Sequence, residues 1–135
     1  LVREGAPISV LGPDIEFLEG TLRSNFAWDD SESADFHFEN LMTLVGFDHW
    51  CQRFGNLDYR IGESNAGLSS SEAAILQVAR AMAQSAETLI LVDALAPLSS
   101  DRQRELLQRL NCSKCRFFVY SSVSDLWEVD AYDID

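Results

Sequence analysis

The sequence predicts an α/β domain of the layered type, in which helices cover a parallel sheet. Two apolar runs, residues 89–92 (LILV) and 116–120 (RFFVY), have the continuous pattern of strands that are buried on both faces of such a sheet. Capped amphipathic helices alternate with these runs along the chain, as they do in α/β domains. Since ligands gather beyond the carboxyl ends of parallel strands, the residues that follow each run are candidate functional residues.

The first part of the chain contains one predicted strand and one predicted helix. Residues 7–11 (PISVL) are β-rich and end at a Gly-Pro-Asp turn. Most of the next stretch is irregular, with one helical turn over 21–26, and the acidic residues 30–34 are expected to form an exposed connection. An amphipathic helix then covers 35–45 and stops at Gly46. Its predicted inward face consists of Phe38, Leu41, Met42 and Val45.

The clearest local signal is the start of a helix at Ser69. A short helix over 48–54 precedes it. Ser69 is followed three residues later by Glu72, which is the spacing of a capping box, and the helix is expected to run to about Ala86. Its predicted buried stripe consists of Ile75, Ala79 and Met82.

The last part of the chain contains both apolar strands. Asp93 stands at the carboxyl end of the first. Residues 100–103 are expected to cap a third amphipathic helix, and a short helix is predicted over 123–129. The inward residues of the third helix are Leu106, Leu107 and Leu110.

Composition and charge exclude several classes of function. The 135 residues are 47% hydrophobic, which is enough for one ordinary core, and the net charge of −12 would repel a nucleic-acid backbone. The apolar runs are far shorter than the roughly 18 residues of a membrane span, so we expect a soluble chain. It begins without Met or a leader, and we expect it to be cut from a longer protein.

The three cysteines do not form an even disulfide framework, which favours a reducing compartment. Cys112 and Cys115 have the spacing of a metal knuckle, and with Cys51 and His49 they would supply four zinc ligands. A zinc site usually has two tight ligand pairs, so the alternative is a turn before a buried strand, with thiols as packing groups.

Four motifs follow one another in an order that is more specific than any of them alone. Residues 8–26 align with a strand, a Q-loop and a Gly-Thr-Ile-Arg-Glu-Asn motif, and residues 68–81 align with an LSGGQ-type helix. Residues 89–100 align with a Walker B strand and its D-loop, and residues 120–131 align with a switch region. In this order they resemble the second half of the nucleotide-binding domain of an exporter-type ABC transporter.

This resemblance implies a partial P-loop NTPase (RecA-like) parallel sheet with an inserted α-helical subdomain. Residues 1–26 would then be a core strand with a Q-loop-like segment. Residues 27–86 would be the helical subdomain that contains the signature, and residues 87–135 the Walker B-like and switch-like part of the core.

The catalytic positions of the family are substituted here. Ala94 stands where the family has its catalytic Glu, Ser121 where it has the switch His, and Pro13 where it has the Q-loop Gln. Loss of a general base typically lowers a rate by about 10²- to 10⁴-fold. The sequence GxxxxGK[ST] of a Walker A loop, which cradles the phosphates of ATP, does not occur in the chain. We therefore expect no catalytic residue and leave enzymatic activity open.

Part of the nucleotide chemistry is retained. The resemblance assigns cofactor binding to Ser69, Ser70, Ser71 and Glu72 and a Mg²⁺ ion, held through water, to Asp93. Because the family signature acts in trans on nucleotide bound by a partner, ATP and Mg²⁺ are expected only with a partner or an upstream segment. Glu72 replaces the signature Gln and adds a negative charge close to where phosphate would lie.

The resemblance also implies a partner surface. In exporters the segment that corresponds to Phe17, Gly20, Thr21 and Arg23 lies against the coupling helices of the membrane domain. The implied partners are a transmembrane transport domain and a second nucleotide-binding domain in a dimer, with no nucleic acid. The implied location is cytoplasmic, peripheral to the membrane.

The first functional hypothesis is therefore a degenerate ABC-transporter ATP-binding domain, or its C-terminal portion, which couples or regulates a membrane domain with little or no hydrolysis. One alternative is a trimmed piece of a domain that binds ATP through an upstream Walker A loop. A second is an α/β interaction scaffold without nucleotide, and a third is a zinc-binding module. In the scaffold, Ser69 and Glu72 would only cap a helix and Asp93 only a loop.

Overall fold

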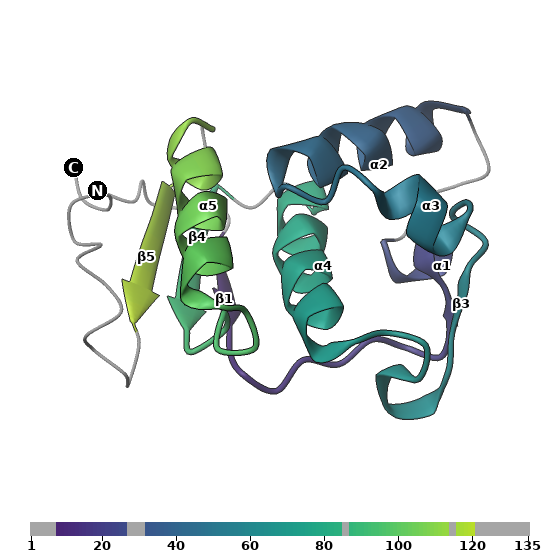
Figure 1. The fold of residues 1–135 in the computed structure, drawn as a ribbon, viewed down its shortest axis with the longest axis horizontal. Coiled ribbons are helices and arrows are strands. Elements are labelled where there is room, and N and C mark those ends of the chain that lie inside the picture. Colours follow the sequence, from purple (N-terminus) through teal and green to yellow (C-terminus); the bar gives the residue numbers. More distant parts are fainter. Residues whose placement is uncertain (1–7, 27–31, 85–86, 114–115, 121–135) are drawn as a thin grey trace.

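A computed structural model describes residues 8–26, 32–84, 87–113 and 116–120 of the chain (Figure 1). Strands β1 (Ile8–Leu11), β4 (Thr88–Val92) and β5 (Arg116–Tyr120) form a parallel sheet with β4 in the middle. Helix α5 (Ser100–Asn111) lies across one face of this sheet. The predicted α/β class and the three predicted strands of the parallel sheet are confirmed.

The two faces of the sheet differ in burial. Leu89 and Leu91 of β4 are fully buried, and Phe117 of β5, which pairs in register with Leu89, is 3% exposed. On the opposite face Val10 is 65% and Tyr120 60% exposed. The prediction of burial on both faces is therefore wrong at Tyr120 of β5, whereas Ile90 and Val92, which lie on the same face in β4, are half-buried.

Helix α5 begins one residue earlier than predicted. Ser99 is the N-cap, and its Oγ accepts a hydrogen bond from the backbone N–H of Arg102 over 3.3 Å. Ser100 is already helical, so the expectation that residues 100–103 contain the cap is corrected to Ser99. The predicted inward residues are confirmed, and these are Leu106, Leu107 and Leu110.

The other helices form a second part of the molecule beside the sheet, to its right in Figure 1. Strands β2 (Gly20–Thr21) and β3 (Arg60–Ile61) pair antiparallel within it. The helical elements are α1 (Leu22–Asn25), α2 (Glu32–Leu44), α3 (Trp50–Phe54), the 3-10 turn η1 (Glu63–Asn65) and α4 (Ser70–Ala83).

Helix α4 connects the two parts, since it packs against β1 and against α2. Residues 73–79 are buried on every side of the helix, so the predicted stripe of Ile75, Ala79 and Met82 is too narrow, and Met82 is only half-buried. The helix ends at Ala83, earlier than the predicted Ala86, which lies outside the described residues. A helix that is apolar all round is typical of a buried position.

Helix α2 begins earlier than predicted. The exposed connection expected over 30–34 is wrong from residue 32 onward, because α2 starts at Glu32 and Ala34 is only 2% exposed. Ala34, Phe38 and Met42 follow one another at four-residue spacing and therefore share one buried face. Three of the predicted inward residues are confirmed as buried, namely Phe38, Met42 and Val45, while Leu41 is half-buried.

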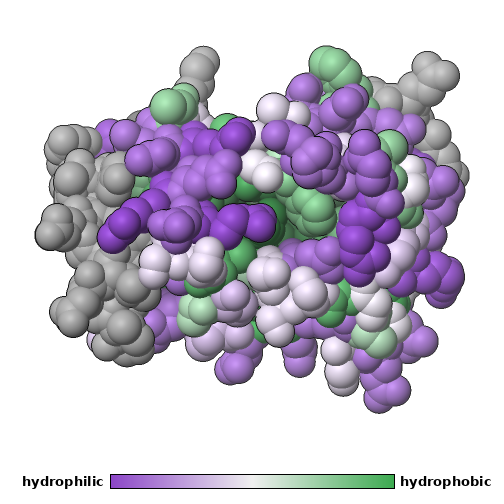
Figure 2. Space-filling model, viewed as in Figure 1, coloured by the Kyte–Doolittle hydropathy of each residue, from purple (hydrophilic) through white to green (hydrophobic). Residues whose placement is uncertain are grey.

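Polar side chains cover most of the face seen in Figure 2, and apolar side chains show in the hollow at its centre. No helix among the described residues is long and apolar enough to cross a membrane. The helix predicted over 123–129 lies outside the described ranges.

Candidate functional site

The start of α4 has the predicted capping box. The Oγ of Ser69 accepts a hydrogen bond from the backbone N–H of Glu72 over 3.1 Å. In return the backbone N–H of Ser69 donates to Oε1 of Glu72 over 2.8 Å. The Oγ atoms of Ser69 and Ser71 lie 3.3 Å apart, and Ser70 is exposed. The four predicted binding residues are thus brought together, but the carboxylate of Glu72 is turned back onto its own helix terminus.

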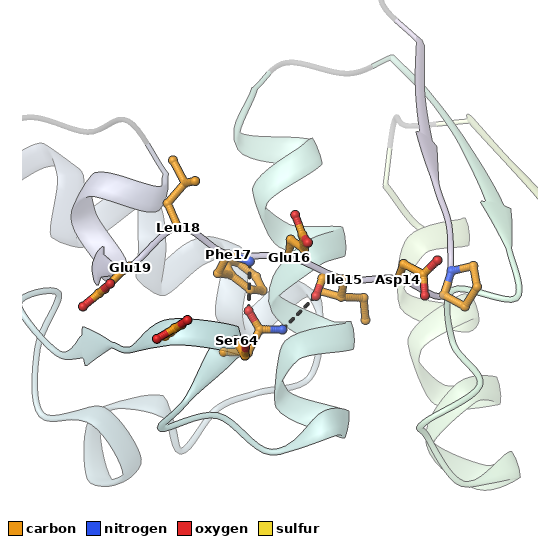
Figure 3. A pocket seen from close by; sticks show the side chains of 10 residues that line it. Asp14, Ile15, Glu16, Phe17, Leu18, Glu19 and Ser64 are labelled. Carbon is orange, nitrogen blue, oxygen red and sulfur yellow. Dashed lines mark hydrogen bonds between the residues drawn. The ribbon is translucent and has the colours of Figure 1, made fainter.

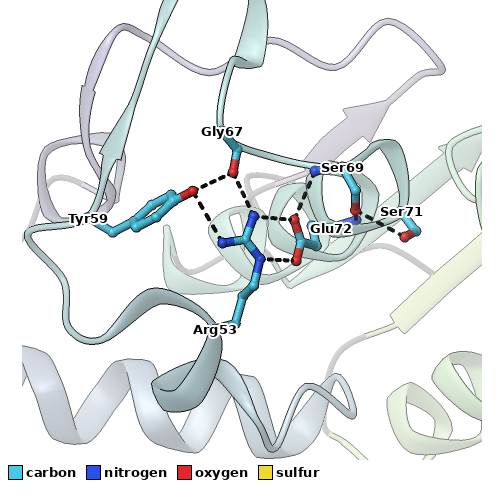
Figure 4. Close-up of polar contacts among 6 residues, drawn as sticks. All are labelled: Arg53, Tyr59, Gly67, Ser69, Ser71 and Glu72. Carbon is cyan, nitrogen blue, oxygen red and sulfur yellow. Dashed lines mark hydrogen bonds and ion pairs between the residues drawn. The ribbon is translucent and has the colours of Figure 1, made fainter.

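A residue that the sequence did not reveal, Arg53 of α3, binds this carboxylate. Its Nε donates to Oε2 of Glu72 over 2.6 Å and its Nη2 to Oε1 over 3.1 Å, which is the bidentate geometry of a strong ion pair (Figure 4). Nη2 also donates to the carbonyl oxygen of Gly67 over 2.8 Å. The negative charge of Glu72, which we expected to face a phosphate, is therefore compensated within the chain.

Tyr59 completes the network in Figure 4. Its hydroxyl donates to the Gly67 carbonyl over 2.6 Å and accepts from Nη1 of Arg53 over 3.2 Å. The guanidinium carbon lies 4.8 Å from the centre of the Phe54 ring and 5.3 Å from that of Tyr59, within the range of cation–π attraction. Arg53 is thus held by a carboxylate, a carbonyl and two aromatic rings at once.

These contacts shift the pKa of both partners. Burial raises the pKa of the Glu72 carboxyl, but hydrogen bonds from Arg53 and Ser69 and the charge of Arg53 outweigh it, so that the pKa lies below its ordinary value of 4.5. The hydrogen bond to Glu72 is the main cause that raises the pKa of Arg53, followed by the one to Tyr59. Both groups therefore carry their full charge at neutral pH.

We expect Glu72→Gln to lower the free energy of unfolding at pH 7 by about 1 kcal/mol. The variant should therefore unfold at a lower temperature than the parent chain. The value is modest because the Arg53 side chain is 37% exposed and its charge is screened by solvent. Since the folded pKa of Glu72 is lowered, the pair stabilises the fold above pH 4.5, and this contribution is lost as the pH falls through the lowered pKa. Thermal unfolding followed between pH 7 and pH 3 measures the difference.

The matched control is Glu105→Gln. Glu105 pairs with Arg109 over 3.3 Å one turn along α5, and 49% of its side chain is exposed. An exposed pair of this kind contributes about 0.5 kcal/mol or less. An equal loss in both variants, or a Glu72→Gln effect that persists unchanged at pH 3, would show that the carboxylate of Glu72 does not stabilise the start of α4.

The end of β4 carries the predicted metal residue. Asp93 has a φ of 52°, in the left-handed region, and its backbone N–H donates to the carbonyl of Tyr120 at the end of β5 over 2.9 Å. In Figure 1 the carboxyl ends of β4 and β5 and the amino end of α4 all lie at the lower side of the molecule. One side of the molecule thus carries both groups of predicted binding residues.

The neighbour of Asp93 offers no catalytic group. Ala94 is 1% exposed, so its methyl group is part of the core and no second carboxylate follows Asp93. Ser121 lies outside the described residues. Over the described ranges no three His, Cys, Asp or Glu side chains are grouped to hold a metal ion, and Cys51 and Cys112 are exposed. His49 is exposed as well, and Cys115 is not among the residues described.

Two asparagines clamp the segment that joins β1 to β2, residues 12–19. Oδ1 of Asn65 accepts from the N–H of Phe17 over 2.9 Å, and its Nδ2 donates to the carbonyl of Ile15 over 2.8 Å (Figure 3). Asn25 accepts from the N–H of Leu18 over 2.8 Å and donates to the carbonyls of Leu18 and Thr21 over 2.8 and 3.0 Å. Four of these five bonds fix a segment that has no regular secondary structure, and the fifth holds Thr21 of β2.

Side chains of helix α4 bind the same segment. The guanidinium of Arg80 lies 4.3 Å from the centre of the Phe17 ring and donates to the carbonyl of Glu16 over 3.1 Å. Burial lowers the pKa of Arg80. Gln77, only 5% exposed, donates to the carbonyl of Gly12 over 3.3 Å. The segment is therefore tied to α4 as well as to Asn25 and Asn65.

The predicted partner residues have structural contacts of their own. Phe17 is 6% exposed and belongs to the core. Thr21 caps α1, and Arg23 lies 3.4 Å from Asp58 and 3.9 Å from Asp35 in ion pairs. A Cβ atom on Gly20 would lie 2.9 Å from the Ser24 hydroxyl. The apolar side chain that this segment exposes is Leu18, at 76%.

We expect Asn25→Ala to lower the free energy of unfolding by about 2–3 kcal/mol, because Asn25 is 6% exposed and three hydrogen bonds are lost. Urea unfolding measures the change. Asn25→Asp keeps the acceptor for Leu18 but places a carboxylate oxygen against the carbonyls of Leu18 and Thr21, so it should lose at least as much as Asn25→Ala. Asn40→Ala, at an exposed position of α2, is the control and should change stability by less than about 0.5 kcal/mol. Equal effects of the substitutions at Asn25 and Asn40 would contradict the clamp.

Comparisons with known proteins give a consistent result. No family model matches the chain. The chain is similar to proteins of Rickettsia conorii and Rickettsia felis that are both named "Putative export ATP-binding/permease protein", with 21% and 20% identity over 104 residues. The match covers 76% of this chain and 18% of each relative, so the chain spans less than a fifth of their length.

A solved structure of a bacterial Atm1-family ABC exporter with ATP bound is also similar. The TM-score is 0.69 at 17% identity, and the match covers 84% of this chain and 20% of the exporter chain. At this identity the likeness shows a shared fold. Together with the curated relatives, it confirms the resemblance to exporter-type ABC proteins that the order of the motifs indicated.

Proposed function

We propose that this chain is the C-terminal portion of a degenerate ATP-binding domain of an exporter-type ABC transporter, which couples or regulates a membrane transport domain with little or no ATP hydrolysis. The observation that carries the proposal is the end of β4, where Asp93 is followed by the buried methyl group of Ala94. The strand order β1-β4-β5 and the exporter likeness support a partial P-loop NTPase sheet.

The position of Ala94 bears directly on hydrolysis. In the family a Glu at this position positions or deprotonates the attacking water. A methyl group can do neither, and Ala94 is turned into the core. Ser121 occupies the switch position, where the family has its His. Neither of these two family positions therefore supplies a general base.

The start of α4 supports a weakened role in trans. The backbone N–H of Ser69 already binds the carboxylate of Glu72, and Arg53 neutralises that carboxylate. The hydroxyl groups of Ser69, Ser70 and Ser71 remain as contacts for a phosphate that a second nucleotide-binding domain would hold. Asp93 would then bind Mg²⁺ through water. ATP and Mg²⁺ are thus part of the proposal only with a partner or an upstream segment.

The division of the chain belongs to the same proposal. Residues 1–26 and 87–135 would form the core, and residues 27–86 the helical subdomain with the signature. Phe17, Gly20, Thr21 and Arg23 would shape the surface toward the membrane domain, at the cytoplasmic face of the membrane. Their contacts within the chain favour a supporting role for them, beneath the exposed Leu18.

Thermal unfolding with Mg-ATP tests this function. A ligand at 100 times its Kd stabilises a fold by about 2.7 kcal/mol, which raises the unfolding midpoint of a domain of this size by several degrees. We expect no rise for residues 1–135 alone and a rise for the full-length gene product, with Mg²⁺ alone as the control. A rise for the chain alone would contradict the proposal. No rise in either would favour the interaction scaffold, because it binds no nucleotide.

A further inference from the structure

We infer that Arg109 of α5 is a latch that fixes the helical part of the molecule against the sheet part. The sheet part consists of β1, β4, β5 and α5, and the helical part consists of the elements from β2 to α4. Nη1 of Arg109 donates to the carbonyl oxygen of Thr43, in the last turn of α2, over 2.8 Å. The bond joins residues that are 66 positions apart in the chain and lie in different parts of the molecule.

Helix α2 is already terminated by its own residues. The N–H of Gly46 donates to the carbonyl of Thr43 over 3.2 Å, and the N–H of Phe47 donates to that of Met42 over 2.7 Å. Gly46 has a φ of 82°, and these two bonds have the pattern of a Schellman motif. Arg109 is thus a second donor to a carbonyl that already has one. Because the helix ends without it, its bond serves to join the two parts.

The charge of Arg109 is favourable at this position. The carboxyl end of a helix carries a partial negative charge, and α2 has no basic residue of its own in its last turn. Arg109 supplies this cation from the other part of the molecule. Glu105, one turn earlier on α5, accepts from Nη2 of Arg109 over 3.3 Å, a longer bond than the one to Thr43. The contact with α2 is therefore the closer of the two.

Gly46 allows the last turn of α2 to approach α5 closely. A Cβ atom at this position would lie 3.3 Å from Nε of Arg109, which is tighter than ordinary van der Waals contact. It would also lie 3.5 Å from Oε2 of Glu105. Since glycine has no side chain, the turn that follows α2 lies directly against the guanidinium group.

The latch lies apart from two other connections between the parts. Segment 12–19 joins them along the lower side of Figure 1, and α4 packs against β1. The carboxyl end of α2 faces α5 in the upper half of the same view. The side chain of Arg109 is 36% exposed, and Thr43 is exposed as well, so the bond can open without exposing the core. Opening the latch frees the helical part to move against the sheet part while both stay folded.

The distance between two exposed thiols measures how the parts are placed. Cys51 lies on α3 in the helical part, and Cys112 directly follows α5 in the sheet part. Both are labelled with nitroxides in the full-length gene product, after its other cysteines, Cys115 included, have been replaced. Double electron–electron resonance then gives the distribution of their distance. We expect Arg109→Ala to broaden this distribution about twofold or more, as relative movement of two bodies does.

Two variants on α5 separate the latch from other roles of this helix. Glu105→Gln removes the ion pair but keeps the bond to Thr43, and Arg104→Ala removes an exposed charge of the same helix. Both should leave the distribution as narrow as that of the parent. Far-ultraviolet circular dichroism should show the same helix content in all variants.

An unchanged distribution in Arg109→Ala, or equal broadening in Glu105→Gln, would overturn the inference. Loss of helix content in Arg109→Ala would overturn it too, because Arg109 would then be needed for folding and not for the placement of the parts. The measurement contains no nucleotide, so its outcome is independent of the proposed function.

Discussion

Replacing Phe38 with alanine is expected to lower the free energy of unfolding by about 3–5 kcal/mol, the range for a buried Phe→Ala change. Phe38 is fully buried in α2. Its ring lies 5.2 Å from that of Phe26 and 4.8 Å from that of Trp50, both edge-on. The substitution leaves a cavity where α1, α2 and α3 meet. Urea unfolding followed by near-ultraviolet circular dichroism measures the loss, because Trp50 reports on this cluster.

Phe36 provides the control on the same helix. It is 62% exposed, so Phe36→Ala removes little buried surface and should cost less than about 0.5 kcal/mol. If both variants were destabilised equally, the packing of α2 described here would be wrong. A result at the upper end of the range for Phe38 would leave the helical part of the chain close to unfolded, given the stability of ordinary domains.

The elements that the sequence predicted well are those with a long and regular pattern. The apolar run of β4 and the leucines of α5 each repeat one signal over several residues. The capping box at Ser69 and Glu72 is a pair of residue types at one fixed spacing. Strands β2 and β3 were missed because each has two residues, too few for any alternation. They are held instead by pairing between residues far apart in the chain, such as Thr21 with Arg60.

The start of α2 was missed for a different reason. Residues 30–34 are acidic and contain Ser, which suggested an exposed connection. Ala34, however, falls on the same face as Phe38, and burial of that face extends the helix to Glu32. Tertiary packing thus outweighed local composition.

The candidate site was predicted in its residues but not in its charge balance. Glu72 was identified at the helix start, whereas Arg53, which lies 19 residues earlier and on another helix, was not. The chain has only 10 Lys and Arg against 22 Asp and Glu, so few cations are candidates for a partner of Glu72. The sequence does not indicate which of them pairs with it, because α3 and α4 meet only in the folded chain.

The sequence did not show which side chains of the predicted partner segment are exposed. Alignment of the motif pointed to Phe17 as a partner residue, whereas the extended segment turns Phe17 inward and exposes Leu18. Period-two alternation of Asp14, Glu16 and Leu18 is the signal that would have distinguished them. Asn25, which matched the motif in the sequence, is the side chain that fixes this arrangement.

The most direct test of the account is the rate of ATP hydrolysis by the full-length gene product. Because Ala94 supplies no general base and is buried, the account predicts a rate at least about 10²-fold below that of an ABC exporter that keeps the carboxylate, measured side by side with saturating Mg-ATP. A partner that completes the assembly should be present in one series. Hydrolysis as fast as that of the intact exporter, by the product alone, would contradict the account.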